Sequence, residues 1–367
     1  MKAKRKDESL PPRDVLEKFL LGFEGTSLPQ ELRELLAGGL GGVAIYPRNF
    51  SSAEGLRALT EEIRRAADGP VLIGIDQEGG TKFSLPEPFT QWVSPEELGR
   101  LNHEATVERQ AQAMGRELRA VGVNLNFAPM LDLHVNPDSS VTKGRSFGSD
   151  PRGVSRLGVA FIRGMGEGGV LACAKHFPGH GDARIDPHQD LPVQEGTTRL
   201  LEGQELVPFA AAIRAQVTTV MTAHILMPEI DPVHPASLSR KLLTDVLRER
   251  MEFGGVILAD DLGMRAIAQR YGVGEAAVES LRAGSDMVML CHDWGSVRPT
   301  IEKVAEKKGR GGFAEREWEA SQQRIDLTRR AVGNLDQFYG QASIREVGRA
   351  EHRKLAEAIR ARAASRS

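Results

Sequence analysis

Short apolar runs recur along the chain and alternate with longer segments in which apolar residues have helical spacing. Eight of these runs can be counted, at residues 19–23, 42–46, 71–75, 125–128, 171–175, 219–223, 256–259 and 287–290. An apolar run of four or five residues is typical of a strand buried on both faces, as in a parallel sheet. Eight such strands alternating with helices predict a single α/β domain of the (β/α)8 TIM barrel type.

The segments between the runs carry charged residues among apolar ones at intervals of three and four, which predicts amphipathic helices. The clearest of them are residues 53–67, 104–121, 154–167, 200–215 and 274–283. We expect residues 1–335 to form the barrel and residues 336–367 to form a C-terminal helical tail. We assign this basic tail no chemistry.

Polar side chains follow the predicted strands directly. They are Glu24, Arg48, Asn49, Asp76, Gln77, Glu78, Asp132, Lys175, His176, His224, Asp260 and Asp261. In a (β/α)8 barrel these positions converge on the face formed by the C-terminal ends of the strands, where active sites occur. One carboxylate after a strand could instead cap a helix, but capping does not explain the whole set. The pattern therefore predicts an enzyme.

Two carboxylates, Asp260 and Asp261, follow the seventh run in the sequence GGVILADDLGM. Because adjacent residues of a strand point to opposite sides, we expect only one of them to face the barrel centre. A carboxylate fixed in that position can serve as the nucleophile of glycoside hydrolysis, while a second group protonates the leaving oxygen.

The segment KHFPGHGDARIDPHQD brings together His176, His180, Asp182, Asp186 and His188. This density indicates a metal site, a proton-transfer array or a hydrogen-bonded loop. Barrel hydrolases that bind metal usually collect ligands from several strand ends. Since the first strand, FLLGFEG, has no histidine pair, we expect no metal.

The longest connection without predicted secondary structure is residues 177–195, which we interpret as a lid. Within it, Asp186 and His188 could lie on the same side of an extended segment, so that the carboxylate orients the imidazole and favours its protonated form. The pair would then shuttle a proton. The alternative is an ordinary solvated loop histidine.

Composition narrows the class of partner. The chain has 48 basic and 50 acidic residues, and its net charge of −2 gives no overall field that favours nucleic acid or an anionic membrane. No apolar run reaches the ~18 residues of a membrane span, and no apolar stretch follows the basic N-terminus, so we expect a cytoplasmic protein with a small substrate. Cys173 and Cys291 lie in apolar runs and are interpreted as buried thiols. The glycines of residues 164–169 precede a strand instead of following one, which argues against a dinucleotide cofactor.

Five motifs in order, IDQEGG, NFAPMLD, GRSFGSD, KHFPGHGD with DPH, and ADDLGM, resemble those of glycoside hydrolase family 3 β-N-acetylglucosaminidases over residues 19–290. The KHFPGHG stretch followed by Asp-x-His resembles the N-acetylglucosaminidase branch of that family. Related glucosidases take their acid/base from a glutamate in another domain.

The resemblance implies that Asp260 is the nucleophile and that Asp186 and His188 form the acid/base dyad. It also implies that four residues hold the sugar, namely Asp76, Arg145, Lys175 and His176. Asp132 and His224 would support them. Two positions depart from the family pattern. Thr81 stands where an arginine is common, which bears on specificity, and Pro187 replaces a usual serine, which stiffens the lid.

These observations together predict a retaining hydrolase that removes terminal, non-reducing β-linked N-acetylglucosamine and needs no cofactor. The resemblance further suggests a muropeptide from peptidoglycan as the substrate, in cell wall recycling. One alternative is a phosphorylase, because a histidine acid/base lacks the charge with which a carboxylate repels phosphate. Others are a β-glucosidase and an inactive sugar-binding protein, although the presence of Asp260, Asp186 and His188 argues against loss of catalysis.

Overall fold

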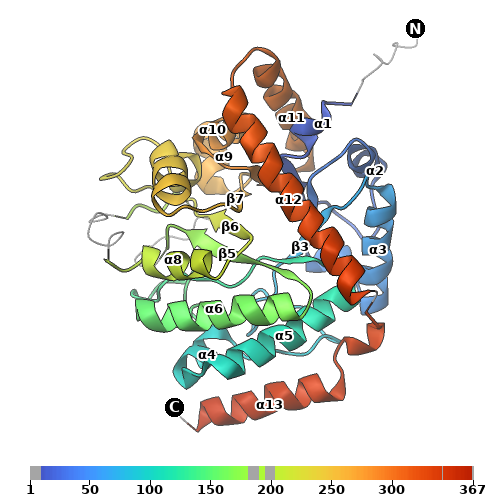
Figure 1. Ribbon diagram of the computed structural model, residues 1–367, viewed down its shortest axis with the longest axis vertical. Helices are drawn as coiled ribbons and strands as arrows, with labels where there is room; N and C mark the ends of the chain where they lie inside the picture. The colour runs from blue at the N-terminus through green and yellow to red at the C-terminus, as the bar shows by residue number, and fades with distance from the viewer. Residues whose placement is uncertain (1–9, 181–189, 195–202, 341, 366–367) are drawn as a thin grey trace.

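Eight parallel strands close into a barrel in the computed structural model, which describes residues 10–180, 190–194, 203–340 and 342–365 (Figure 1). Each strand pairs with the next, and β1 pairs with β8. The strands are β1 (Phe19–Leu21), β2 (Gly42–Ile45), β3 (Leu72–Ile75), β4 (Leu125–Asn126), β5 (Leu171–Phe177), β6 (Thr219–Thr222), β7 (Val256–Asp261) and β8 (Met287–Leu290). The predicted barrel and its eight strands are confirmed.

Helices cover the outside of the barrel (Figure 1). They are α1 (Arg13–Leu16), α2 (Gln30–Ala37), α3 (Ala53–Ala66), α4 (Pro95–Leu101), α5 (Glu104–Ala120), α6 (Pro151–Glu167), α8 (Leu206–Arg214), the π-helical η3 (Lys241–Arg250), α9 (Arg265–Tyr271), α10 (Val273–Ala283), α11 (Trp294–Gly309), α12 (Glu315–Tyr339) and α13 (Ala350–Ala364). Short 3-10 turns are η1 (Pro47–Asn49), η2 (Ala236–Leu238) and η4 (Ile344–Glu346).

Helix α6 begins three residues before the predicted segment. The side chain of Asp150 accepts hydrogen bonds from the backbone N–H groups of Arg152 and Gly153, and Pro151 occupies the first helical position. An aspartate cap followed by proline is a strong helix start, which apolar spacing alone does not reveal. In contrast, the predicted segment 200–215 contains α8, and its first residues lie outside the described ranges.

The barrel interior is filled by side chains that alternate with those facing the helices. The inner cluster includes Leu20, Leu72, Phe127, Leu258 and Met287, while the larger outer cluster joins strands to helices. Cys173 and Cys291 are buried and free, as predicted.

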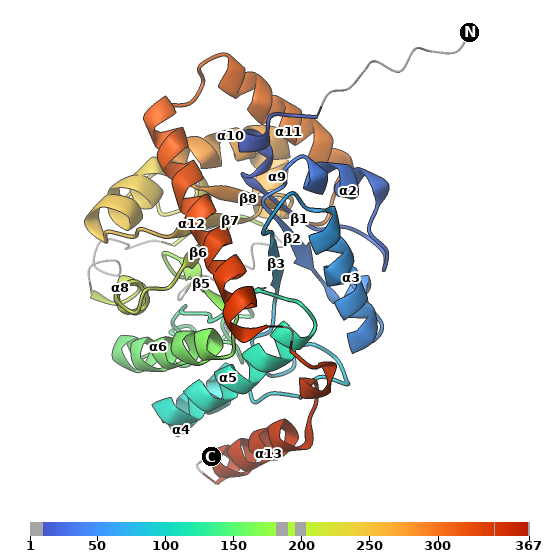
Figure 2. The same ribbon diagram turned by 45° about the vertical axis from the view of Figure 1, so that its right-hand side comes forward.

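Helix α12 lies across the end of the barrel where the strands begin (Figure 2). Its residues Ile325 and Val332 join the inner cluster, and Arg329 pairs with Glu17, which precedes β1. This helix therefore covers the end of the barrel at which the strands begin.

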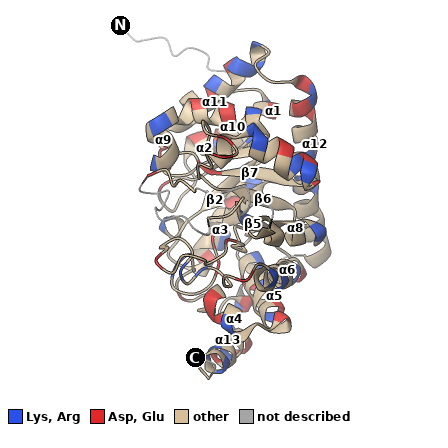
Figure 3. Cartoon of the chain, turned by 90° about the vertical axis from the view of Figure 1, so that its left-hand side faces the viewer, with Lys and Arg blue, Asp and Glu red and all other residues tan. Residues whose placement is uncertain are grey.

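Helix α13 packs against α4 and α5, where the ring of His352 is buried beside Glu117. The boundary expected at residue 335 stays a prediction, and α12 continues across it to Tyr339. Acidic and basic residues are interspersed on the outer helices (Figure 3). None of the helices within the described ranges is both long and apolar enough to cross a membrane.

Candidate active site

The C-terminal ends of the strands surround a cavity of about 540 Å³, within the size range of small-molecule sites. Five of the predicted residues line it, namely Asp76, Arg145, Lys175, His176 and Asp260. The predicted dyad of Asp186 and His188 lies outside the described residues.

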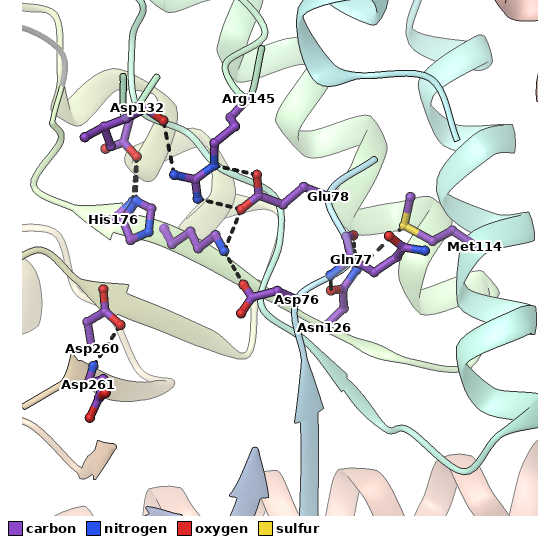
Figure 4. A network of polar contacts seen from close by, with 12 residues as sticks. Asp76, Gln77, Glu78, Met114, Asn126, Asp132, Arg145, His176, Asp260 and Asp261 are labelled. Carbon is purple, nitrogen blue, oxygen red and sulfur yellow. Dashed lines mark hydrogen bonds and ion pairs between the residues drawn. The ribbon is translucent and has the colours of Figure 1, made fainter. Parts of the chain in front are cut away.

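A charged network on one wall of the cavity includes Asp76, Glu78 and Arg145 (Figure 4), and Lys175 joins its two carboxylates. The Nζ of Lys175 is 2.6 Å from Asp76 Oδ1 and 2.7 Å from Glu78 Oε1. The guanidinium of Arg145 donates two hydrogen bonds to Glu78, at 2.8 and 2.7 Å. Glu78 is buried, whereas Asp76 is partly exposed, so its carboxylate can accept a sugar hydroxyl.

Charge attraction keeps this network ionised despite its burial. Burial alone would favour neutral Glu78, but Arg145 and Lys175 outweigh it and lower the pKa of Glu78 to about 2. Burial likewise works against the Lys175 ammonium, yet Asp76 and Glu78 raise the pKa of Lys175 above its usual value. The cavity therefore offers a fixed ammonium and a fixed carboxylate to a polyhydroxyl ligand.

Asp132 is buried beneath the cavity and holds two histidines in place. Its Oδ2 accepts a hydrogen bond from Nδ1 of His176 at 2.7 Å, and its Oδ1 accepts one from the backbone N–H of His180 at 2.7 Å. Because Nδ1 of His176 faces a carboxylate, that nitrogen carries the proton and Nε2 is left for the cavity. Asp132 orients His176 and does not itself border the cavity.

Asp260 and Asp261 both border the cavity, and their carboxylates point away from each other (Figure 4). The β7–β8 register shifts between Ala259 and Asp261. Asp261 accepts hydrogen bonds from the N–H groups of Cys291 and Gly263, both at 3.0 Å, and from the ring of His292 at 2.6 Å.

The carboxylate of Asp260 is left for a ligand. Among the described residues, its one recorded hydrogen bond comes from the N–H of Asp261, at 2.8 Å. Burial raises the pKa of Asp260, but the rings of His224 and His176, that N–H and the Lys175 ammonium lower it more, so the net shift is downward. Asp260 is therefore ionised at neutral pH, as a nucleophile must be.

His224 lies behind the end of β7 and outside the cavity wall. Its Nε2 donates to the carbonyl of Asp261 at 3.0 Å, and its Nδ1 accepts from the hydroxyl of Ser237 at 2.7 Å. Burial lowers the pKa of His224, and the nearby Asp260 carboxylate offsets part of that effect. His224 therefore positions the end of β7 by holding its backbone.

Three aromatic residues of the cavity were not predicted. Tyr46 and His292 follow β2 and β8, and their rings lie 5.2 Å apart. Phe83 covers the charged network, with its ring centroid 4.2 Å from the Arg145 guanidinium carbon. The strand-end rule could have identified Tyr46 and His292. By contrast, Glu24 and Arg48 pair with each other, and Arg48 also bonds the Phe23 carbonyl, which is a structural role.

Comparison with known proteins identifies the family. Residues 20–327 match the Glycosyl hydrolase family 3 N terminal domain. The chain belongs to glycosyl hydrolase family 3. It is therefore a glycoside hydrolase, as its strand-end residues and motifs predicted.

Curated relatives of this family 3 hydrolase include two proteins named Beta-hexosaminidase. The one from Thiobacillus denitrificans is 38% identical over 285 residues, which cover 76% of this chain and 79% of the relative. The one from Idiomarina loihiensis is 36% identical over 283 residues, which cover 76% and 84%.

Solved structures agree with the family assignment. A glycoside hydrolase family 3 β-N-acetylglucosaminidase from Paenibacillus sp. superimposes with a TM-score of 0.89 at 32% identity, covering 96% of this chain and 68% of that chain. NagZ from Neisseria gonorrhoeae in complex with N-trifluoroacetyl-D-glucosamine gives a TM-score of 0.74 at 31% identity, covering 95% and 99%. Within the described part of this family 3 hydrolase, no group of three or more His, Cys, Asp or Glu residues could hold a metal ion.

Proposed function

We propose that this family 3 hydrolase removes terminal, non-reducing β-linked N-acetylglucosamine with net retention, using Asp260 as the nucleophile. The observation that carries the proposal is an ionised Asp260 in the cavity wall, next to an Asp261 that already accepts three hydrogen bonds from the protein. The relatives named Beta-hexosaminidase and the N-trifluoroacetyl-D-glucosamine complex support the choice of sugar.

The reaction proceeds in two displacements. In the first, Asp260 attacks the anomeric carbon, the glycosidic bond breaks, and His188 donates its proton to the departing oxygen. In the second, His188 takes a proton from water, the water oxygen attacks the same carbon, and Asp260 leaves. Asp186 favours the imidazolium of His188 in the first step. The roles of Asp186 and His188 rest on sequence, since both lie outside the described residues.

The charged wall of the cavity binds the sugar in this scheme. Asp76 accepts a hydroxyl hydrogen, while the Lys175 ammonium donates to hydroxyl oxygens. His176 presents Nε2 at a position that Asp132 fixes. Because these groups are already oriented by each other, little reorganisation is needed as charge develops at the anomeric carbon.

A panel of aryl β-glycosides tests the choice of sugar. We expect kcat/KM for the N-acetylglucosaminide to exceed that for the glucoside by roughly 10² or more, because hydrogen bonds to the acetamido group strengthen transition-state binding. The N-acetylgalactosaminide is the matched control for the 4-hydroxyl. The comparison also tests whether Thr81, which stands where the family commonly has an arginine, changes the specificity for the sugar. Equal or faster turnover of the glucoside would contradict the proposed sugar, while a retaining mechanism could still hold.

Replacing His188 by alanine tests the acid/base. The variant should lose about 10²- to 10⁴-fold in rate on an unactivated disaccharide but far less on a dinitrophenyl glycoside, whose leaving group needs no proton. Azide attacks without general-base help, so it should restore turnover of the activated substrate and give a β-glycosyl azide. If both substrates slow equally and azide has no effect, His188 is not the acid/base.

We also propose a muropeptide fragment of peptidoglycan as the natural substrate and cell wall recycling in the cytoplasm as the setting. Both rest on the family resemblance of the motifs. Release of free N-acetylglucosamine from purified muropeptides, in buffer with and without phosphate, also separates hydrolysis from phosphorolysis, since a phosphorylase would release the 1-phosphate only when phosphate is present.

A further inference from the structure

A second cavity, of about 740 Å³, lies at the closed end of the barrel and is here called the basal cavity. It is bordered by η3, α10 and the first half of α12. It lies beside the beginnings of β1 and β8, because Lys18 and Ser285, which precede these strands, border it. Six cationic side chains border it, namely Lys18, Arg240, Arg248, Arg282, Arg316 and Arg324, against two carboxylates, Glu249 and Glu317.

Lys18 is a buried cation with neutral partners. Its side chain is 0% exposed, and its Nζ lies 2.7 Å from the hydroxyl of Ser321 and 4.6 Å from the ring centroid of Trp318. Across the described ranges, no carboxylate oxygen lies within 4 Å of this ammonium. Burial lowers the pKa of Lys18 to about 8, and the nearby Asp286 offsets only part of that effect. A buried ammonium without a carboxylate partner is unfavourable unless an anion is bound.

The nearest buried carboxylate is already shared by two other cations. Asp286 accepts a hydrogen bond from Arg248 at 2.7 Å and one from Arg324 at 2.9 Å. Its carboxylate is fully buried, and the two arginine side chains are only 18% and 21% exposed. Three cations, Lys18, Arg248 and Arg324, therefore share one negative charge, which leaves two positive charges in excess at the inner wall.

The outer wall adds aromatic surface and further cations. The rings of Phe313 and Trp318 lie 4.8 Å apart. Arg282 pairs with Glu279 at 2.9 Å, and Arg240 pairs with Glu317 at 2.8 Å. Both arginines are neutralised in these pairs, and the other two lining charges, Arg316 and Glu249, are of opposite sign, so the excess charge is that of the inner wall near Lys18.

We propose that the basal cavity binds a small phosphate-bearing ligand with at least two negative charges, which Arg248 and Arg324 contact directly and the fully buried Lys18 attracts from behind the cavity wall. The excess of two positive charges sets the minimum charge of the ligand. Arginine guanidinium groups suit phosphate oxygens in geometry as well as charge, and the cavity volume suits a small organic phosphate. This site is at the opposite end of the barrel from Asp260, so the inference goes beyond hydrolysis and does not depend on it.

Calorimetric titration of the full chain with pyrophosphate, at constant ionic strength, tests the site. N-acetylglucosamine is present at saturating concentration, so that it occupies the candidate active site and pyrophosphate cannot bind the cations there. Parallel titrations with inorganic phosphate and glucose 6-phosphate distinguish a free phosphate group from a phosphate ester. We expect saturable binding of one pyrophosphate, with a Kd that rises at least tenfold in Arg324→Gln and in Lys18→Met.

Arg100→Gln is the matched control, because Arg100 forms an exposed pair with Glu96 far from this cavity and its loss should change the Kd by less than twofold. Lys18→Met keeps most of the side-chain volume, so it remains a test if Arg324→Gln fails to fold. Absence of saturable binding, or a Kd that is the same in Lys18→Met as in the parent chain, would overturn the proposal.

Discussion

Asp260→Asn should lower kcat/KM on an aryl β-N-acetylglucosaminide by a factor of about 10⁴ or more, with little change in the free energy of unfolding. The amide has nearly the shape of the carboxylate but carries no charge and cannot form the bond to the anomeric carbon. Its oxygen can still accept the N–H of Asp261. Steady-state kinetics and denaturant unfolding of the same preparations measure both effects.

Asp261→Asn is the matched control for this prediction. Asp261 accepts N–H groups from Cys291 and Gly263 at one oxygen and the ring of His292 at the other, and a neutral amide weakens these charge-assisted hydrogen bonds. We therefore expect this variant to lose about 1–3 kcal/mol of stability and to keep more activity than Asp260→Asn. A larger loss of activity in Asp261→Asn, with Asp260→Asn still turning over, would reverse the assignment of the two carboxylates.

Glu78→Gln should destabilise the fold by about 3 kcal/mol near neutral pH. The carboxylate is 1% exposed and receives two hydrogen bonds from Arg145 and an ion pair from Lys175. Glutamine keeps the shape but removes the charge, so Arg145 is left as a buried guanidinium without its partner. Denaturant unfolding measures the difference in stability. Sugar binding should also weaken, because Glu78 holds Arg145 and Lys175 in place.

The difference in stability between the parent chain and Glu78→Gln should depend on pH. The pKa of Glu78 is about 2 in the folded chain against an ordinary 4.5. Its ionised form therefore stabilises the fold fully above pH 4.5, and this contribution is lost as the pH falls from 4.5 to about 2. The stability difference between the parent and Glu78→Gln should shrink over that interval.

Glu275→Gln is the control, since Glu275 forms an exposed pair with Lys303 and its loss should cost less than about 1 kcal/mol at every pH. A Glu78→Gln deficit no larger than that of the control, or one that persists unchanged in acid, would contradict the role given to Glu78.

The barrel could be predicted from the sequence because each strand is a short apolar run bounded by polar residues. That pattern follows from burial on both faces and needs no tertiary information. The strand-end rule then predicted which residues gather at the candidate active site, since parallel strands bring their last residues to one face. Asp76, Lys175 and Asp260 do border one cavity, although 99 residues separate the paired Lys175 and Asp76.

Contacts within the site could not be predicted in the same way. The strand-end rule does not distinguish Asp132 and His224, which hold other residues, from His176, which borders the cavity. The pairing of Arg145 with Glu78 spans 67 residues and depends on how two loops fold over the barrel. The shift in the β7–β8 register between Ala259 and Asp261 likewise has no sequence signal of its own.

The closed end of the barrel was also hidden in the sequence. Ile325 and Val332 lie among charged residues at helical spacing, which predicts an amphipathic helix but not which surface it covers. The excess charge around Lys18 appears only once α12 is placed across the strands. Sequence patterns report local burial, whereas charge balance in a cavity is a property of the assembled fold.

Trapping the covalent intermediate tests the central claim most directly. A 5-fluoro N-acetylglucosaminyl fluoride slows both displacements through the ring fluorine, while its good leaving group lets the first proceed, so the glycosyl-enzyme accumulates. Mass spectrometry of the proteolysed protein should find the sugar on the peptide that contains Asp260, with none in Asp260→Asn. A sugar attached to any other residue, or hydrolysis of an aryl N-acetylglucosaminide that releases the inverted α-anomer first, would contradict the account.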